Sequence, residues 1–200
     1  MKSSAEHIRA RDEVFCRIGR NVLLFQQIEL MLKTLLNNGQ FKGTLSELKQ
    51  LVGQRATSTD KRTFGQLIDP GIDHHFTPFD EDAVTFAGTK EISVAFHFAV
   101  EHTAEQRETF RADLKSLVAE RNELIHHSLS RFHLDSIAGC LSASAELERQ
   151  QERIEPLSNK LREIICTMVD FNTTIMNELP AILRGKPESG AALSRAQTGR

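Results

Sequence analysis

Cysteine is scarce in this 200-residue sequence, and tryptophan and tyrosine are absent. The three cysteines, Cys16, Cys140 and Cys166, lie far apart and form no CxxC pair. This spacing excludes a disulfide framework and a zinc knuckle, because both need several thiols at characteristic spacings. The sequence also lacks a glycine-rich phosphate loop. We therefore expect reduced thiols in a cytoplasmic protein, with no cofactor and no metal.

Long apolar runs and a large net charge are missing as well. No segment reaches the roughly 18 apolar residues of a membrane span, and residues 1–11 are polar where a signal peptide would be apolar. The 25 basic and 27 acidic side chains give a net charge of -2, which excludes the broad positive field of a protein that coats nucleic acid. We expect a soluble intracellular protein without membrane contact, whose nucleic-acid contacts are local.

Hydrophobic residues make up 40% of the chain, enough for one buried core at this length. Their spacing predicts a mainly all-α fold. In residues 5–36 apolar side chains recur at steps of three and four, typical of a helix with one buried stripe, which ends at Asn37-Asn38-Gly39. The predicted stripe consists of Phe15, Ile18, Val22, Phe25, Leu32 and Leu36. Glu29 falls within it, and a buried carboxylate needs a partner or a proton.

Shorter elements follow this helix. Residues 46–54 predict a short helix, and 64–68 a short turn before a break at Pro70-Gly71. In residues 91–100 large apolar side chains alternate strictly with small or polar ones, which is the period of a β-strand. With a partner strand just before it, this segment predicts a small β-hairpin insertion near 83–100.

A second long helix is predicted from a capping box at Thr103 and Gln106 to about His127. Its stripe consists of Phe110, Leu114, Leu117, Arg121 and Leu124. Arg121 and Glu29 are thus the charged residues on the stripes of the two best-defined helices. We expect them to form one buried ion pair in which Glu29 orients Arg121.

The last long helix is predicted from about Ser142 to Leu179-Pro180, interrupted or restarted at Glu155-Pro156. Its apolar residues keep a seven-residue pattern, which either closes the bundle or builds a dimer seam. The final segment is small and polar. The sequence therefore predicts one domain over 1–182 and a disordered tail over 183–200.

The segment from Glu120 to His127 concentrates polar chemistry on the second long helix. The guanidinium of Arg121 keeps its charge and suits a phosphate, and a histidine exchanges protons near neutral pH. Asn122 and His126 share a helix face, whereas Arg121 and His126 are about 140° apart. Metal-independent RNA cleavage needs a base, an acid and a cation near the phosphorus, and these residue types supply them.

The run Arg121-Asn122-Glu123-Leu124-Ile125-His126 resembles the R-x4-6-H signature of the HEPN superfamily, in which a polar residue follows the arginine and the histidine lies near a helix end. The resemblance implies a HEPN-like helical bundle with long first, central and last helices. It also implies a metal-independent endoribonuclease of toxin or phage-defence type, with RNA as substrate. Further implications are a homodimer that unites two copies of Arg121, Asn122 and His126, and a nucleotidyltransferase-like antitoxin or another regulatory partner.

These residues also have ordinary uses. Arg121 suits a structural ion pair with Glu29, His126 suits a helix C terminus where the dipole favours its charged form, and His127 suits solvent. His127 is therefore only an additional candidate for the site. The Glu-x-x-His spacing ending at His126 occurs once, whereas a di-iron bundle needs two such motifs. The alternative function is a non-catalytic HEPN-like module that binds a nucleotide or a partner protein.

Overall fold

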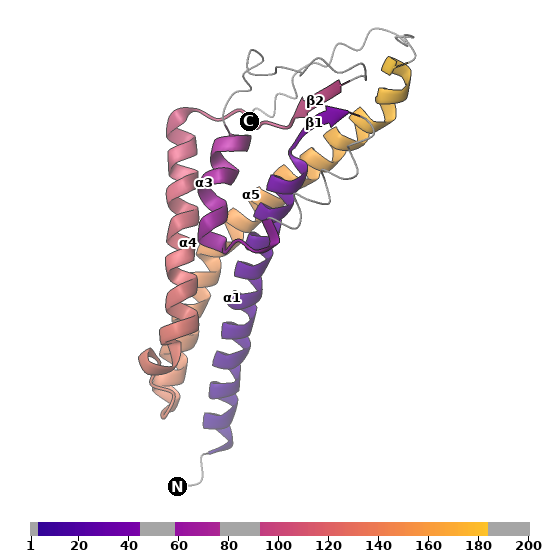
Figure 1. Ribbon diagram of the computed structural model, residues 1–200. Helices are drawn as coiled ribbons and strands as arrows, with labels where there is room; N and C mark the ends of the chain where they lie inside the picture. The colour runs from indigo at the N-terminus through magenta and orange to yellow at the C-terminus, as the bar shows by residue number, and fades with distance from the viewer. Residues whose placement is uncertain (1–3, 45–58, 77–92, 184–200) are drawn as a thin grey trace.

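The computed structural model describes residues 4–44, 59–76 and 93–183, and it is mainly helical. Figure 1 shows three long helices, α1 (Ala5–Asn38), α4 (Ala104–Arg131) and α5 (Ile137–Leu183), with the shorter α3 (Phe64–His75) beside α4. A small two-stranded sheet lies at one end. The expected all-α class with three long helices is confirmed. The predicted helix at 46–54, the first part of the predicted hairpin and the predicted tail after Leu183 lie outside the described residues.

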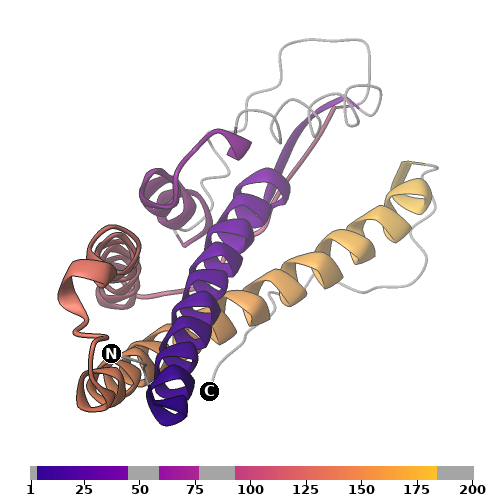
Figure 2. The same ribbon diagram turned by 90° about the horizontal axis from the view of Figure 1, so that it is seen from below.

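Helix α1 packs along α5, and the two run in the same direction. At the start of α1 the His7 ring nitrogen Nε2 hydrogen-bonds the Leu134 carbonyl oxygen at 2.8 Å, just before α5 begins. At its end Asn172 Nδ2 of α5 donates to the Asn38 carbonyl oxygen at 3.1 Å. Figure 2 shows the resulting oblique crossing. The predicted seven-residue pattern of the last helix therefore closes the bundle against α1.

The buried stripe of α1 is shifted by one residue from the predicted one. It consists of Val14, Asn21, Phe25, Ile28, Leu32 and Leu35. Phe25 and Leu32 were predicted correctly, but Phe15 is 46% exposed. The helix carries apolar side chains on two faces, so periodicity alone did not identify which face packs against the core.

The small sheet joins β1 (Gln40–Thr44) and β2 (Ser93–His97) as an antiparallel pair. The predicted strand is thus confirmed over 93–97, but its partner in the described structure follows α1 directly instead of lying near residue 84. The rings of Phe41 and Phe96 face each other across the sheet, 5.3 Å apart. This pairing spans about fifty residues of sequence, and a local turn signal cannot reveal a partner that distant.

Helix α3 passes through Pro70 and Gly71, so the break predicted there is wrong. Proline removes one helical hydrogen bond and usually costs about 3 kcal/mol. Contacts with α4 offset this cost: Arg111 donates to Asp69 and to Asp73, each at 2.7 Å, and so bridges the helix across the proline. These carboxylates, Asp73 foremost, raise the pKa of the Arg111 guanidinium.

Helix α4 begins at the predicted capping box, where Gln106 N donates to Thr103 Oγ1 and Thr103 N to the Gln106 side chain. It ends at Arg131, four residues beyond the predicted end. Helix α5 begins five residues before Ser142 and continues through Pro156, so the predicted interruption is wrong. Its buried stripe continues on both sides of the exposed proline, with Leu147, Ile154, Leu161, Ile164 and Met168. Tertiary packing of this stripe outweighs the lost hydrogen bond.

Gly39 ends α1 and lies against the buried ring of His75. A Cβ at position 39 would be 2.1 Å from Cε1 and 2.6 Å from Nδ1 of that ring. We expect Gly39→Ala to lower the free energy of unfolding by about 1–3 kcal/mol, because the ring or the helix end must move. Gly65→Ala is the matched control, since its Cβ would meet only Val118, at 3.6 Å. Equal urea-unfolding midpoints for the two variants would contradict this close approach.

His75 connects α3 to the end of β2 and should make stability pH-dependent. It is fully buried, Nδ1 lies 3.1 Å from the Phe98 carbonyl oxygen, and burial lowers the pKa of His75 to about 4. Between pH 6.5 and 4 the unfolded chain therefore binds the proton more readily than the folded one. Stability should be complete above about pH 6.5 and fall by up to about 3 kcal/mol as the pH approaches 4. Urea unfolding at several pH values should show a shallower loss in His75→Gln than in the natural protein, and an unchanged loss in His133→Gln, where an exposed histidine is removed.

Candidate functional site

The central helix α4 presents the predicted motif on its solvent side. Its buried face consists of Phe110, Leu114, Leu117 and Leu124. At about 100° per residue, Asn122 and His126 lie on the opposite face, and both side chains are exposed. The expectation that these two residues share an outward face is confirmed.

Arg121 lies in line with the buried face of α4, as predicted, but it does not pair with Glu29. It is half-buried, and its Nη1 donates to Asn122 Oδ1 at 3.1 Å. Glu29 instead accepts from Lys33 Nζ at 2.9 Å, one turn along the same helix. The predicted Glu29–Arg121 pair is therefore wrong, and Glu29 does not orient Arg121. A partner on the same helix needs no alignment between helices, which favours Lys33.

The imidazole rings of His126 and His127 have no hydrogen-bond partner within the part of the chain that the structure describes, although the His127 carbonyl oxygen accepts from Ser130 Oγ at 2.9 Å. Both are exposed, and their ring centroids are 6.3 Å apart. Because α4 continues to Arg131, neither histidine lies at the helix end. The helix dipole acts mainly within the last turn, so a role in capping the helix does not explain His126.

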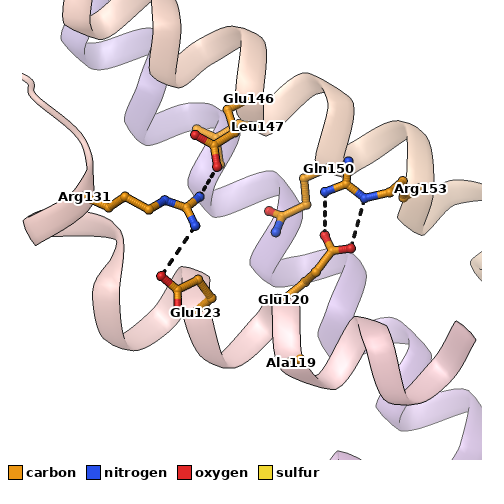
Figure 3. A pocket seen from close by; sticks show the side chains of 8 residues that line it. All are labelled: Ala119, Glu120, Glu123, Arg131, Glu146, Leu147, Gln150 and Arg153. Carbon is orange, nitrogen blue, oxygen red and sulfur yellow. Dashed lines mark hydrogen bonds and ion pairs between the residues drawn. The ribbon is translucent and has the colours of Figure 1, made fainter. Parts of the chain in front are cut away.

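The two acidic residues nearest Arg121 and Asn122 form ion pairs beside the contact between α4 and α5. Glu120 accepts two hydrogen bonds from Arg153, at 3.0 and 2.9 Å. Glu123 lies 3.5 Å from Arg131, which also pairs with Glu146. Figure 3 shows these pairs: Glu120–Arg153 and Arg131–Glu146 join α4 to α5, and Glu123–Arg131 lies within α4. The negative charges next to Arg121 in sequence are thus neutralised on the side of α4 that faces α5.

These ion pairs line a hollow of about 230 Å³ between α4 and α5. Its lining consists of Ala119, Glu120, Glu123, Arg131, Glu146, Leu147, Gln150 and Arg153. None of the predicted site residues lies in it. Sequence reasoning missed Arg131 and Arg153 because Arg131 pairs with Glu146 and Arg153 with Glu120 across two helices, and the spacing along one helix carries no signal for such pairs. The charges in this hollow are mutually satisfied, which suits a structural role.

Histidines gather at the other end of the molecule, around the small sheet. The rings of His74 and His75 are 6.4 Å apart, and those of His75 and His97 are 5.7 Å apart. Within residues 4–44, 59–76 and 93–183, no three histidine, cysteine or acidic side chains form a group that could hold a metal ion. Among the helices of these ranges, none is both long and apolar enough to span a bilayer.

Comparison with protein-family models, with curated proteins and with solved structures gives no match for this chain. The candidate site therefore rests on its own residues. It consists of an exposed asparagine and an exposed histidine one turn apart on α4, together with a half-buried arginine that bonds the asparagine from the adjoining face.

Because Arg121 bonds only a neighbouring side chain in the described structure, its removal should disturb the fold little. We expect Arg121→Ala to lower the free energy of unfolding by less than about 1 kcal/mol. Arg111→Ala is the comparison: this arginine bridges α4 to α3 through Asp69 and Asp73, so we expect a loss of about 1–2 kcal/mol. The measurement is urea unfolding of both variants. A larger loss in Arg121→Ala than in Arg111→Ala would make Arg121 a structural residue.

Proposed function

We propose that this chain is a metal-independent endoribonuclease of toxin or phage-defence type, in which Arg121, Asn122 and His126 form one half of a composite site. The observation that carries the proposal is the exposed face of α4. There Asn122 and His126 lie one turn apart, the half-buried Arg121 donates to Asn122 from the adjoining face, and the neighbouring carboxylates are paired with other arginines.

The chemistry needs a proton acceptor and a proton donor on opposite sides of one phosphorus. One histidine takes the proton of the ribose 2′-hydroxyl, whose oxygen forms a bond to phosphorus. The bond to the 5′-oxygen breaks, and a second histidine in its protonated form gives that oxygen a proton. The products are a 2′,3′-cyclic phosphate and a 5′-hydroxyl end. The guanidinium stabilises the additional negative charge on the phosphoryl oxygens in the transition state.

A single α4 offers His126 on only one side of a phosphate. A second copy that presents the same face across a two-fold axis supplies the second histidine and a second arginine. His127 is an additional candidate, because its ring lies next to that of His126. The proposed partners are therefore RNA, a second copy of the chain, and a regulatory protein such as a nucleotidyltransferase-like antitoxin, all in a cytoplasmic setting.

Cleavage of total RNA and of tRNA in EDTA tests this proposal. We expect His126→Ala to slow cleavage by about 100-fold or more, which is the usual contribution of a general acid or base. Arg121→Ala and Asn122→Ala should also slow it, and His133→Ala, which removes an exposed histidine after α4, should not. The natural protein should leave 2′,3′-cyclic phosphate ends. Unchanged rates in both His126→Ala and Arg121→Ala would end the enzymatic proposal.

A non-catalytic binding module is the second candidate. It is favoured by the exposed apolar side chains that α1 carries on the face away from the core, because exposed apolar surface marks contact sites between proteins. This function predicts no RNA cleavage above the level of His126→Ala. The same assay therefore separates the two functions.

A further inference from the structure

Half of the exposed large apolar side chains of the described residues lie on one helix. Eight such residues occur, and four belong to α1: Ile8, Phe15, Leu23 and Leu30, which are 41%, 46%, 60% and 64% exposed. At about 100° per residue they fall within an arc of about 80°, on the side of α1 opposite its buried stripe. We name these four residues the outer stripe.

The outer stripe is symmetric about Gly19. Phe15 and Leu23 are each four residues from this glycine, and Ile8 and Leu30 are each eleven residues from it. Gly19 is exposed, and a Cβ built on it would have no neighbour within 4 Å. Glycine in the middle of a helix is destabilising, but its lack of a side chain permits another backbone to approach closely. No contact within the described part of the chain requires glycine at this position.

We infer that the outer stripe binds the outer stripe of a second copy, with the two α1 helices antiparallel and crossing at Gly19. In this arrangement Phe15 meets Leu23 of the second copy, and Ile8 meets Leu30 of the second copy. We call each such pair of meeting residues a layer. Each layer occurs twice, because the two-fold axis passes between the two glycines and repeats every contact on its other side. A sequence symmetric about one residue produces matched layers in this orientation.

Polar residues also match in the antiparallel orientation: Asp12 and Gln26 lie inside the arc of the outer stripe, and Arg11 and Glu29 lie on one flank of it. Arg11 and Glu29 become neighbours between the copies at both ends of the contact. Asp12 comes opposite Gln26. A parallel pair in register would instead place Asp12 against Asp12, and such a like-charge pair is destabilising. Charge complementarity therefore selects the antiparallel pair of identical chains.

The size of the outer stripe sets the expected strength of the contact. Leu30 lies 22 positions after Ile8, which corresponds to about 33 Å of helix. With a helix width of about 10 Å, the contact should bury on the order of 1,000 Å² in total, just below the usual range for stable interfaces. We expect a dimer with a Kd in the micromolar range. This inference does not rest on the proposed catalysis, because Asn122 and His126 lie on another helix.

Sedimentation equilibrium between about 1 and 200 µM tests whether the contact exists. The natural chain should dimerise, and Leu23→Glu should raise the Kd at least about 30-fold because it places a carboxylate in the central layer. Leu141→Glu is the matched control, because Leu141 is 62% exposed but lies on α5. Circular dichroism establishes that both variants are folded. A natural chain that stays monomeric, or a Leu23→Glu variant that dimerises as well as Leu141→Glu, would overturn the inference.

Disulfide cross-linking tests the orientation. The background is Cys16→Ser with Cys166→Ser, which removes the two exposed thiols. Two variants are prepared separately in this background, one with Ile8→Cys and the other with Leu30→Cys, and are then mixed. After mild oxidation the mixture should form a cross-link between the two different chains, and neither preparation alone should cross-link. Cross-links within each single preparation would indicate a parallel pair and contradict the inference. The two hypotheses can be tested separately. Loss of RNA cleavage in His126→Ala, with the dimer retained, would bear on the proposed catalysis and leave the α1 contact unaffected.

Discussion

The burial of Asn21 between α1 and α5 is the interaction on which the remaining packing depends. Its side chain is fully buried, and Nδ2 donates to the Leu147 carbonyl oxygen at 2.9 Å and to Gln150 Oε1 at 3.0 Å. Sliding α1 along α5 by one turn would leave this amide without partners, at a cost of about 1–3 kcal/mol. A single buried asparagine thus sets the register of the pair, as it does in coiled coils.

That register decides what each helix presents to solvent. With α1 fixed on α5, the arginines of α5 and of the end of α4 meet Glu120 and Glu123. The carboxylates of Glu120 and Glu123 are thereby paired with arginines, while Asn122 and His126 stay exposed to solvent. A phosphate approaching that outer face meets Arg121 without an opposing unpaired carboxylate from Glu120 or Glu123, which favours anion binding by a chain that is acidic overall.

Local signals predicted the helices well, and contacts between distant segments decided the rest. The capping box at Thr103 and the end of α1 at Gly39 depend on a few neighbouring residues, so they could be read from the sequence. Pro70 and Pro156 were expected to end helices, but each lies where packing against another helix outweighs the lost hydrogen bond.

The site residues divide in the same way. The common face of Asn122 and His126 follows from helix geometry alone and could be predicted. The partner of Arg121 could not be predicted in this way. Glu29 has Lys33 one turn away on its own helix, and Arg121 has Asn122 next to it, so each residue bonds a local partner. For the same reason Phe15 was assigned to the core: two apolar faces of α1 have the same period, and only the position of α5 distinguishes them.

The position of the outer stripe on α1 and of the motif on α4 has a consequence for stoichiometry. Two different surfaces that each contact themselves across a two-fold axis of their own cannot both be satisfied within a pair of chains. The smallest closed particle that uses both has four copies and three perpendicular axes. Its formation would combine two association equilibria, so the fraction of chains with completed sites would fall steeply on dilution.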